Sequence, residues 1–314
     1  MYYYRIYGLN IQSDYWLEEV IPLTEESCQP VDVTIIKGEL PVALTRETPL
    51  DFKENVSYVR HYEPQRGWVR VKGLGCFVME QGKQITYQLK ESCDLRIVNQ
   101  LLLGLIMSVI MIQRGMVALH GSGIILKEKA VVISGVSGAG KSTLAAELLN
   151  RGGIFLADDT VAIKLHKDKV YAQPGYPQQK LCTDALKERD KERGELVWLP
   201  SLGKREKEKY GLRLQKGYAT EERGLHAIFI LQPEETNQVQ LQEITGSEKI
   251  KYLMDNLYKR EIYLNVGMSH EVFRQCVQVA NQVKIYTLTR PVTGMTTQTQ
   301  IERIMEVLHE EDNR

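Results

Sequence analysis

Short runs in which apolar and polar residues alternate open the chain and predict β-strands. The segments YYYRIYGLNI (2–11), VDVTIIKGEL (31–40) and WVRVKGLGCFVME (68–80) are rich in aromatic and β-branched residues. Gln81-Gly82 is a turn signal that introduces QITYQL (84–89) as the second strand of a hairpin. The pattern therefore predicts a small β-rich domain over residues 1–93.

The pattern then changes to a continuous apolar run, LLLGLIMSVIMI (101–112), in a segment that begins near Asp94. A bilayer needs about 20 apolar residues, and this run is shorter and is closed by Gln113 and Arg114. We therefore expect a buried helix and no contact with a membrane.

The rest of the chain alternates strand and helix patterns and predicts a second, α/β domain over residues 94–314. Strands are expected at 115–126, 130–134, 154–157, 225–233 and 283–291, and helices at 142–150, 249–259, 270–282 and 298–310. The segment QPGYPQQKLCTDAL (173–186) is expected to be an irregular loop because of its prolines and glycine. The charged segment 187–216 is either a lid or a solvated surface excursion.

Composition narrows the class of protein. Lys plus Arg and Asp plus Glu are 40 each, so no net positive field attracts nucleic acid. The five cysteines form no CxxC pair and are odd in number, which is typical of reduced thiols. The first residues, MYYYRIYGLN, lack the basic and apolar regions of a signal peptide, so a cytoplasmic protein is expected.

The stretch GVSGAGKS (135–142) carries the clearest chemical signal, the pattern G-x-x-x-x-G-K-[ST]. It lies between a predicted strand and a predicted helix, where a glycine loop can turn backbone N–H groups toward phosphate oxygens. A lysine in this position neutralises phosphate charge, and the following hydroxyl holds Mg²⁺. The predicted nucleotide-binding residues are Gly135, Ser137, Gly138, Ala139, Gly140, Lys141, Ser142 and Thr143.

Asp158 and Asp159 end the strand that follows this helix. Ligands of α/β sheets bind at the carboxyl ends of strands, so the two carboxylates are expected beside the phosphates. One could accept the proton of an incoming hydroxyl while the other binds Mg²⁺. The structural alternative is a capping Asp followed by a solvent-exposed Asp.

LHG (119–121), GVSGAGKS, RGG (151–153) and ADD (157–159) together resemble the catalytic domain of HPr kinase/phosphorylase, a serine kinase with a fold akin to phosphoenolpyruvate carboxykinase. The stretches 7–19, QRG (113–115) before LHGSG, and PGYPQQKLCTDAL are similar to the HPr-kinase-related proteins encoded with lasso peptide precursors. The resemblance implies an ATP- and Mg²⁺-dependent kinase that phosphorylates the C-terminal serine of a precursor peptide. HPr kinases are hexamers, which leaves a homo-oligomer open.

By position, the resemblance makes Asp158 the general base and His120 the histidine that assists it near the γ-phosphate. It makes Lys141 a catalytic phosphate ligand, and Ser142 and Asp159 the metal ligands. From the residues alone, His120 would be a structural histidine. Two departures are Thr143, where HPr kinases have an acidic residue, and a later signature that is not recognisable here, since the three-residue echo at 223–225 is of a length expected by chance.

Three functions stay open at this point. They are a peptide serine kinase, a kinase for a small hydroxyl compound, and a nucleotide-binding regulatory or assembly protein without an acceptor. Lys180 could contact a phosphate or a peptide carboxylate, but a solvated lysine is the more common case.

Overall fold

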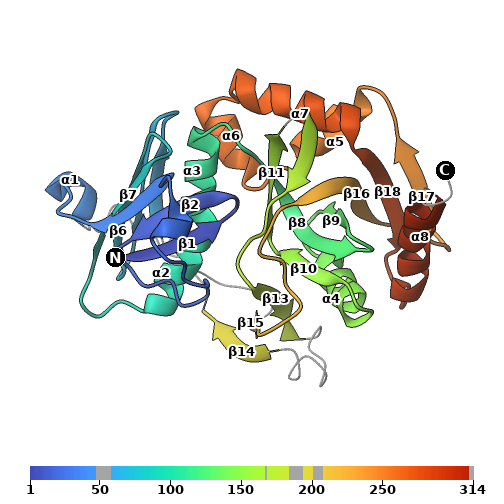
Figure 1. Cartoon of the computed structure of the whole chain (residues 1–314), viewed down its shortest axis with the longest axis horizontal. Helices are drawn as coiled ribbons and strands as arrows, with labels where there is room; N and C mark the ends of the chain where they lie inside the picture. The colour runs from blue at the N-terminus through green and yellow to red at the C-terminus, as the bar shows by residue number, and fades with distance from the viewer. Residues whose placement is uncertain (47–57, 167, 184–193, 201–207, 311–314) are drawn as a thin grey trace.

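The computed structural model describes residues 1–46, 58–166, 168–183, 194–200 and 208–310. Two large β-sheets lie at opposite ends of the molecule, and the long apolar helix stands between them (Figure 1).

The N-terminal sheet has seven strands in the order β1-β2-β3-β7-β6-β5-β4. They are β1 (Tyr2–Ile6), β2 (Leu9–Ser13), β3 (Val33–Lys37), β4 (Tyr58–Tyr62), β5 (Arg66–Val71), β6 (Gly75–Glu80) and β7 (Gln84–Leu89), with short helices η1 (Glu26–Cys28) and α1 (Val42–Thr45) between them. The segment 2–11 is a hairpin that turns at Tyr7 and Gly8, both at positive φ. The β-rich character predicted for this part of the chain is present.

The predicted buried helix is one 19-residue run, Leu95–Gln113, made of α2 (Leu95–Leu101), the π-helical stretch η2 (Leu102–Ile106) and α3 (Met107–Gln113). The Asp94 side chain caps it by accepting a hydrogen bond from the N–H of Arg96. This helix is longer than the apolar run 101–112, and by length and composition alone it could span a bilayer. However, 67% of its most apolar stretch is buried inside the protein. Burial, rather than length, therefore supports a core helix.

This helix packs into the hydrophobic core of the N-terminal sheet, together with Ala118, Ala162, Tyr176, Tyr258 and Ile262 from the rest of the chain. The division of the chain at 93/94 stays a prediction. The helix lies on the carboxyl side of that division, yet it covers the sheet on the amino side.

The second sheet has eight strands in the order β10-β8-β11-β12-β16-β18-β17, with β9 paired to β8 and β16. They are β8 (Val117–Leu126), β9 (Lys129–Gly135), β10 (Ile154–Ala157), β11 (Thr160–His166), β12 (Lys169–Ala172), β16 (Arg223–Glu234), β17 (Gln240–Ile244) and β18 (Lys284–Pro291). Strand β16 runs parallel to β9 and β18, and the other pairs are antiparallel.

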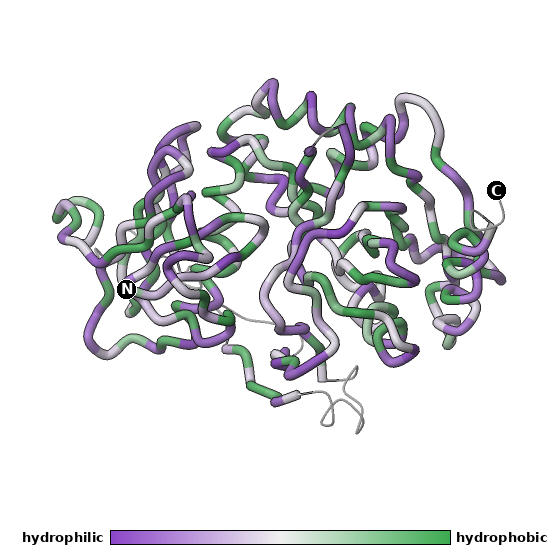
Figure 2. The backbone as a smooth tube through the Cα atoms, viewed as in Figure 1, coloured by the Kyte–Doolittle hydropathy of each residue, from purple (hydrophilic) through white to green (hydrophobic). Residues whose placement is uncertain are grey.

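Helices cover both faces of this sheet (Figure 1). Helices α4 (Lys141–Asn150) and α8 (Thr297–Glu310) share one core with it, and α5 (Glu248–Asp255), α6 (Arg260–Val266) and α7 (His270–Gln282) contribute to the core on the other face. Green and purple alternate along α7 in Figure 2, because its buried residues Val272, Cys276, Val279 and Ala280 recur at the spacing of one helix face. The predicted mixed α/β architecture is confirmed.

A third, antiparallel sheet has the order β13-β15-β14 and consists of β13 (Gln178–Cys182), β15 (Lys209–Leu214) and β14 (Gly194–Leu199). The prediction of an irregular loop over 173–186 is wrong for 178–182, and part of the charged segment 187–216 is sheet. Pairing between strands distant in sequence outweighed the local proline and glycine signals. Residues 184–193 and 201–207, which belong to these two predicted segments, lie outside the described part of the chain.

Candidate active site

The glycine loop joins β9 to α4, as its motif predicts. Gly138 and Gly140 have φ of 81° and 100°, a region that favours glycine. Gly135 has φ of 131° and pairs with Leu231 of β16, so a Cβ there would lie 2.5 Å from the Leu231 carbonyl oxygen. Gly138 and Gly140 therefore leave the backbone uncovered by side chains near the N-terminus of α4, where phosphate oxygens bind well.

The Lys141 side chain folds back onto this loop and is buried. Its Nζ donates hydrogen bonds to the carbonyl oxygens of Gly135, at 2.8 Å, and Val136, at 2.9 Å. Burial lowers the pKa of the Lys141 ammonium from its usual value. The two carbonyls hold the ammonium at the loop, and its third donor is available to a phosphate oxygen.

Asp158 follows β10 and is buried. Its Oδ1 accepts from Ser122 Oγ at 2.6 Å, and its Oδ2 accepts from the backbone N–H of Lys180 at 2.7 Å. Burial raises the pKa of this carboxyl, although both hydrogen bonds act in the opposite direction. Asp158 is thus a carboxylate with more than ordinary affinity for a proton.

Asp159 has the opposite character, and its φ of 66° turns its backbone away from the strand. Its Oδ2 accepts from Lys180 Nζ at 2.8 Å and from the Tyr258 hydroxyl at 3.3 Å. Burial alone would raise the pKa of Asp159, but the Lys180 ammonium and its hydrogen bond hold that pKa well below the usual range. Adjacent carboxyls whose pKa values are pushed apart are typical of a division between proton transfer and charge stabilisation.

His120 lies on β8, paired with Thr160 of β11. Its Nδ1 is 3.1 Å from the backbone oxygen of Asp159, an atom that can only accept. Burial and the nearby Lys141 ammonium lower the pKa of His120. The imidazole is therefore neutral at pH 7, with the proton on Nδ1 and an acceptor lone pair on Nε2.

Several residues at the site were not predicted from sequence. Lys180, expected to be solvated, has a side chain only 17% exposed and is ion-paired with Asp159, so that prediction is wrong. Burial alone would lower the pKa of Lys180, but Asp159 raises it well above the usual value. Lys180 reaches the aspartates from β13, a strand whose sequence carries loop signals.

Arg290, at the end of β18, supports the loop from the other side. Its Nε donates to the backbone oxygen of Ala139 at 3.0 Å. Ser122, Tyr258 and Arg290 belong to ordinary strand or helix patterns, so nothing local in the sequence marks them.

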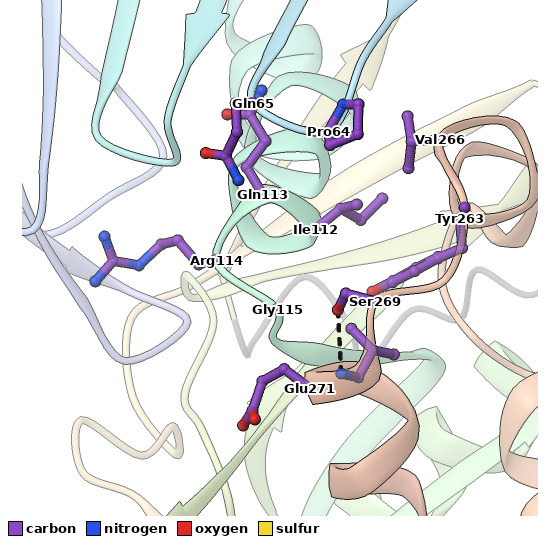
Figure 3. Close-up of a pocket in the computed structure, with 12 residues that line it drawn as sticks. Pro64, Gln65, Ile112, Gln113, Arg114, Gly115, Tyr263, Val266, Ser269 and Glu271 are labelled. Carbon is purple, nitrogen blue, oxygen red and sulfur yellow. Dashed lines mark hydrogen bonds between the residues drawn. The ribbon is translucent and has the colours of Figure 1, made fainter.

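A cavity of about 310 Å³ opens beside His120 and Asp159, whereas Asp158, Lys141 and Lys180 do not line it. His120, Asp159, Gly135 and Val136 form one side, and the segment 255–261 forms the other. A second cavity, of about 220 Å³, lies between the end of α3, the turn at Pro64 and Gln65, and the start of α7 (Figure 3). None of the predicted site residues lines the second cavity.

Mg²⁺ usually binds through one or two carboxylates together with phosphate oxygens and waters. No cluster of three or more His, Cys, Asp or Glu side chains that could hold a metal occurs in the described residues. Asp159 Oδ1 lies 3.7 Å from His120 Nδ1, beyond hydrogen-bond distance, and so keeps lone pairs for a cation. The donor set fits a magnesium ion that arrives with a nucleotide rather than one held by protein alone.

Comparison with known proteins found similar solved structures and a match to a family model. The structure of the HPr(Ser) kinase/phosphatase from Coxiella burnetii aligns with 62% of this chain and 98% of its own, at 11% identity and a TM-score of 0.33, too low to support an argument about the fold. No curated protein matches. Residues 114–182 match the family described as HPr Serine kinase C-terminal domain, so the segment that holds the glycine loop, His120 and both aspartates is HPr-kinase-like.

Proposed function

We propose that the protein is a kinase that transfers the γ-phosphoryl group of ATP to the C-terminal serine hydroxyl of a lasso precursor peptide. The observation that supports it best is Asp158, a buried carboxylate of raised pKa one strand after a phosphate-binding loop. A protein that only binds nucleotide has no need of such a base near its phosphate-binding loop, whereas a hydroxyl that accepts a phosphoryl group does.

The loop amides and Lys141 hold the phosphates, and Arg290 keeps the loop in shape through Ala139. Ser142 and Asp159 would hold Mg²⁺, which neutralises phosphate charge when bound. Lys180 keeps Asp159 ionised at all physiological pH values, as a cation ligand requires.

In the transfer step, the serine oxygen forms a bond to the γ-phosphorus while the bond from that phosphorus to the β,γ-bridging oxygen breaks. ADP leaves with the electron pair, and the hydroxyl proton passes to Asp158. A carboxylate has about four lone-pair sites, so Asp158 can accept this proton while Ser122 and Lys180 still donate to it. Neutral His120 helps to orient the hydroxyl through Nε2.

The peptide acceptor rests on the similarity of 7–19, 113–115 and 174–186 to the lasso-associated kinases. We place the reaction in the cytoplasm, where ATP is available. All five cysteines are free thiols, which suits a reducing compartment.

The test is the intact mass of a lasso precursor peptide ending in serine, after incubation with the protein, ATP and Mg²⁺. We expect one gain of phosphoryl mass that is lost with Lys141→Ala and with the terminal serine replaced by alanine. ATP binding without any gain would contradict the peptide assignment. In that case, transfer to sugars or nucleosides would identify a small-molecule kinase, and transfer to nothing would favour a regulatory nucleotide-binding protein.

A further inference from the structure

The 310 Å³ cavity has a second wall that the phosphate chemistry does not use, the segment 255–261. Small-ligand pockets run from about 300 to 1,000 Å³, so this cavity accepts a single terminal residue rather than a length of chain. An acceptor inside it lies between that wall and the groups His120 and Asp159.

The wall is anchored to the same strand that carries His120. The backbone N–H of His120 donates to the Asn256 oxygen at 2.8 Å, and the N–H of Tyr258 donates to the Ala118 oxygen at 2.8 Å. The residue that follows, Lys259, has φ of 54° and ψ of 43°, a left-handed conformation that costs energy for a residue with a Cβ. The position of Lys259 relative to His120 is therefore set by main-chain contacts.

The charged side chains of this wall form ion pairs, except for Lys259. Asp255 forms an ion pair with Arg260 at 3.2 Å, and Glu261 forms one with Arg60 at 3.9 Å. On the opposite wall, Asp159 is paired with Lys180. Among the described residues Lys259 has no carboxylate partner, and its ammonium lies 5.5 Å from the centre of the Tyr258 ring.

We propose that Lys259 binds the carboxylate of the acceptor and so selects a serine at the free C-terminus of a peptide. This inference rests on the proposed kinase function and adds the group that recognises the acceptor. In a C-terminal serine the carboxylate and the hydroxyl belong to one residue, so a cavity of this size can hold the carboxylate at Lys259 and leave the hydroxyl near His120. An internal serine offers a neutral amide instead and loses the ion pair.

An anionic group at Lys259 could also come from the γ-phosphate of the nucleotide. Replacing Lys259 distinguishes the peptide carboxylate from the nucleotide phosphate, because only the substrate that contacts Lys259 loses affinity. A carboxylate contact changes the KM of the peptide and depends on its terminal group, whereas a phosphate contact changes nucleotide affinity and does not.

The experiment compares a synthetic peptide ending in serine with a free carboxylate and the same peptide as its C-terminal amide. Each is given to the wild type, Lys259→Met, the charge-preserving Lys259→Arg and a control, Lys251→Met. Lys251 is exposed on α5 and does not line the cavity. Assays run near about pH 8 keep His120 neutral in all variants, because loss of Lys259 removes one of the charges that lower the His120 pKa.

For the wild type we expect kcat/KM to fall about ten- to a hundredfold from acid to amide, mainly through KM. Lys259→Met should lower activity on the acid peptide to the level that the wild type shows on the amide peptide. The variant should then use the acid and amide peptides almost equally. Lys259→Arg should recover part of the preference, Lys251→Met should behave as the wild type, and ATP affinity and melting temperature should not change.

Equal use of acid and amide by the wild type would overturn the carboxylate assignment while leaving the kinase function intact. A loss of ATP affinity in Lys259→Met, with the acid preference retained, would assign Lys259 to the γ-phosphate instead. No transfer by the wild type to either peptide would remove the proposed function, and the carboxylate assignment with it.

Discussion

At the scale of single residues, Asp158 and Asp159 show how neighbours in sequence acquire opposite properties. Their carboxylates differ in partners: Asp158 accepts from a neutral hydroxyl and an amide, whereas Asp159 accepts from an ammonium. Burial dominates for Asp158 and raises its pKa, while Lys180 dominates for Asp159 and lowers it. The pair of aspartates was readable from the sequence, but the lysine that distinguishes them was not, because β13 brings it from another part of the chain.

Lys180→Met tests this distinction through pH. Removing one partner of a buried ion pair leaves an uncompensated charge, so we expect a loss of about 3 kcal/mol near neutral pH. The native pair contributes stability above the unfolded pKa of Asp159, and that contribution is lost as pH falls through the lowered folded pKa. In the variant, Asp159 protonates more easily, so the difference in melting temperature from wild type should shrink below about pH 4. Thermal unfolding across pH measures this, and a difference independent of pH would contradict the ion pair.

At the scale of elements, the strand, glycine loop and helix at 129–150 could be predicted because all their signals are contiguous. The third sheet could not, since β13 and β15 pair across a long separation and their local residues favour loops. The sequence also could not predict that Tyr258 and Lys259 lie at the site, because only the main-chain contacts of 256–258 with β8 place them there.

Two glycine substitutions separate packing from phosphate binding within the loop. Gly135→Ala should destabilise the protein by at least about 2 kcal/mol, because its Cβ would meet the Leu231 oxygen of β16. Gly138→Ala meets nothing within 4 Å and should cost only about 1 kcal/mol through its positive φ. Chemical denaturation gives both values, and titration with ATP should show weaker binding for Gly138→Ala. Equal stability losses would mean that the contact with β16 does not hold Gly135 in place.

At the scale of the whole molecule, the candidate site is assembled from β8, β10 and the loop before α4 on the second sheet and from β13 of the third sheet, with the segment 255–261 as its far wall. Side chains of the long helix and of Tyr258 share the core of the N-terminal sheet, so that sheet is packed against the elements that form the site. The pattern of apolar and polar residues predicted β-strands before residue 93 and alternating strands and helices after it. It did not predict that the helix Leu95–Gln113 would cover the N-terminal sheet.

The central claim is that this assembly transfers a phosphoryl group through Asp158, and Asp158→Asn tests it most directly. The measurement is the rate of phosphoryl transfer to the serine-terminated peptide, taken together with ATP affinity, for the wild type and the variant. We predict that the variant binds ATP with an affinity within a few-fold of the wild type, because the glycine loop that binds the phosphates is unchanged. Its transfer rate should be lower by about a hundred- to ten-thousandfold, because the proton acceptor is lost. Near-normal transfer by the variant would contradict the account and leave Asp158 a structural residue.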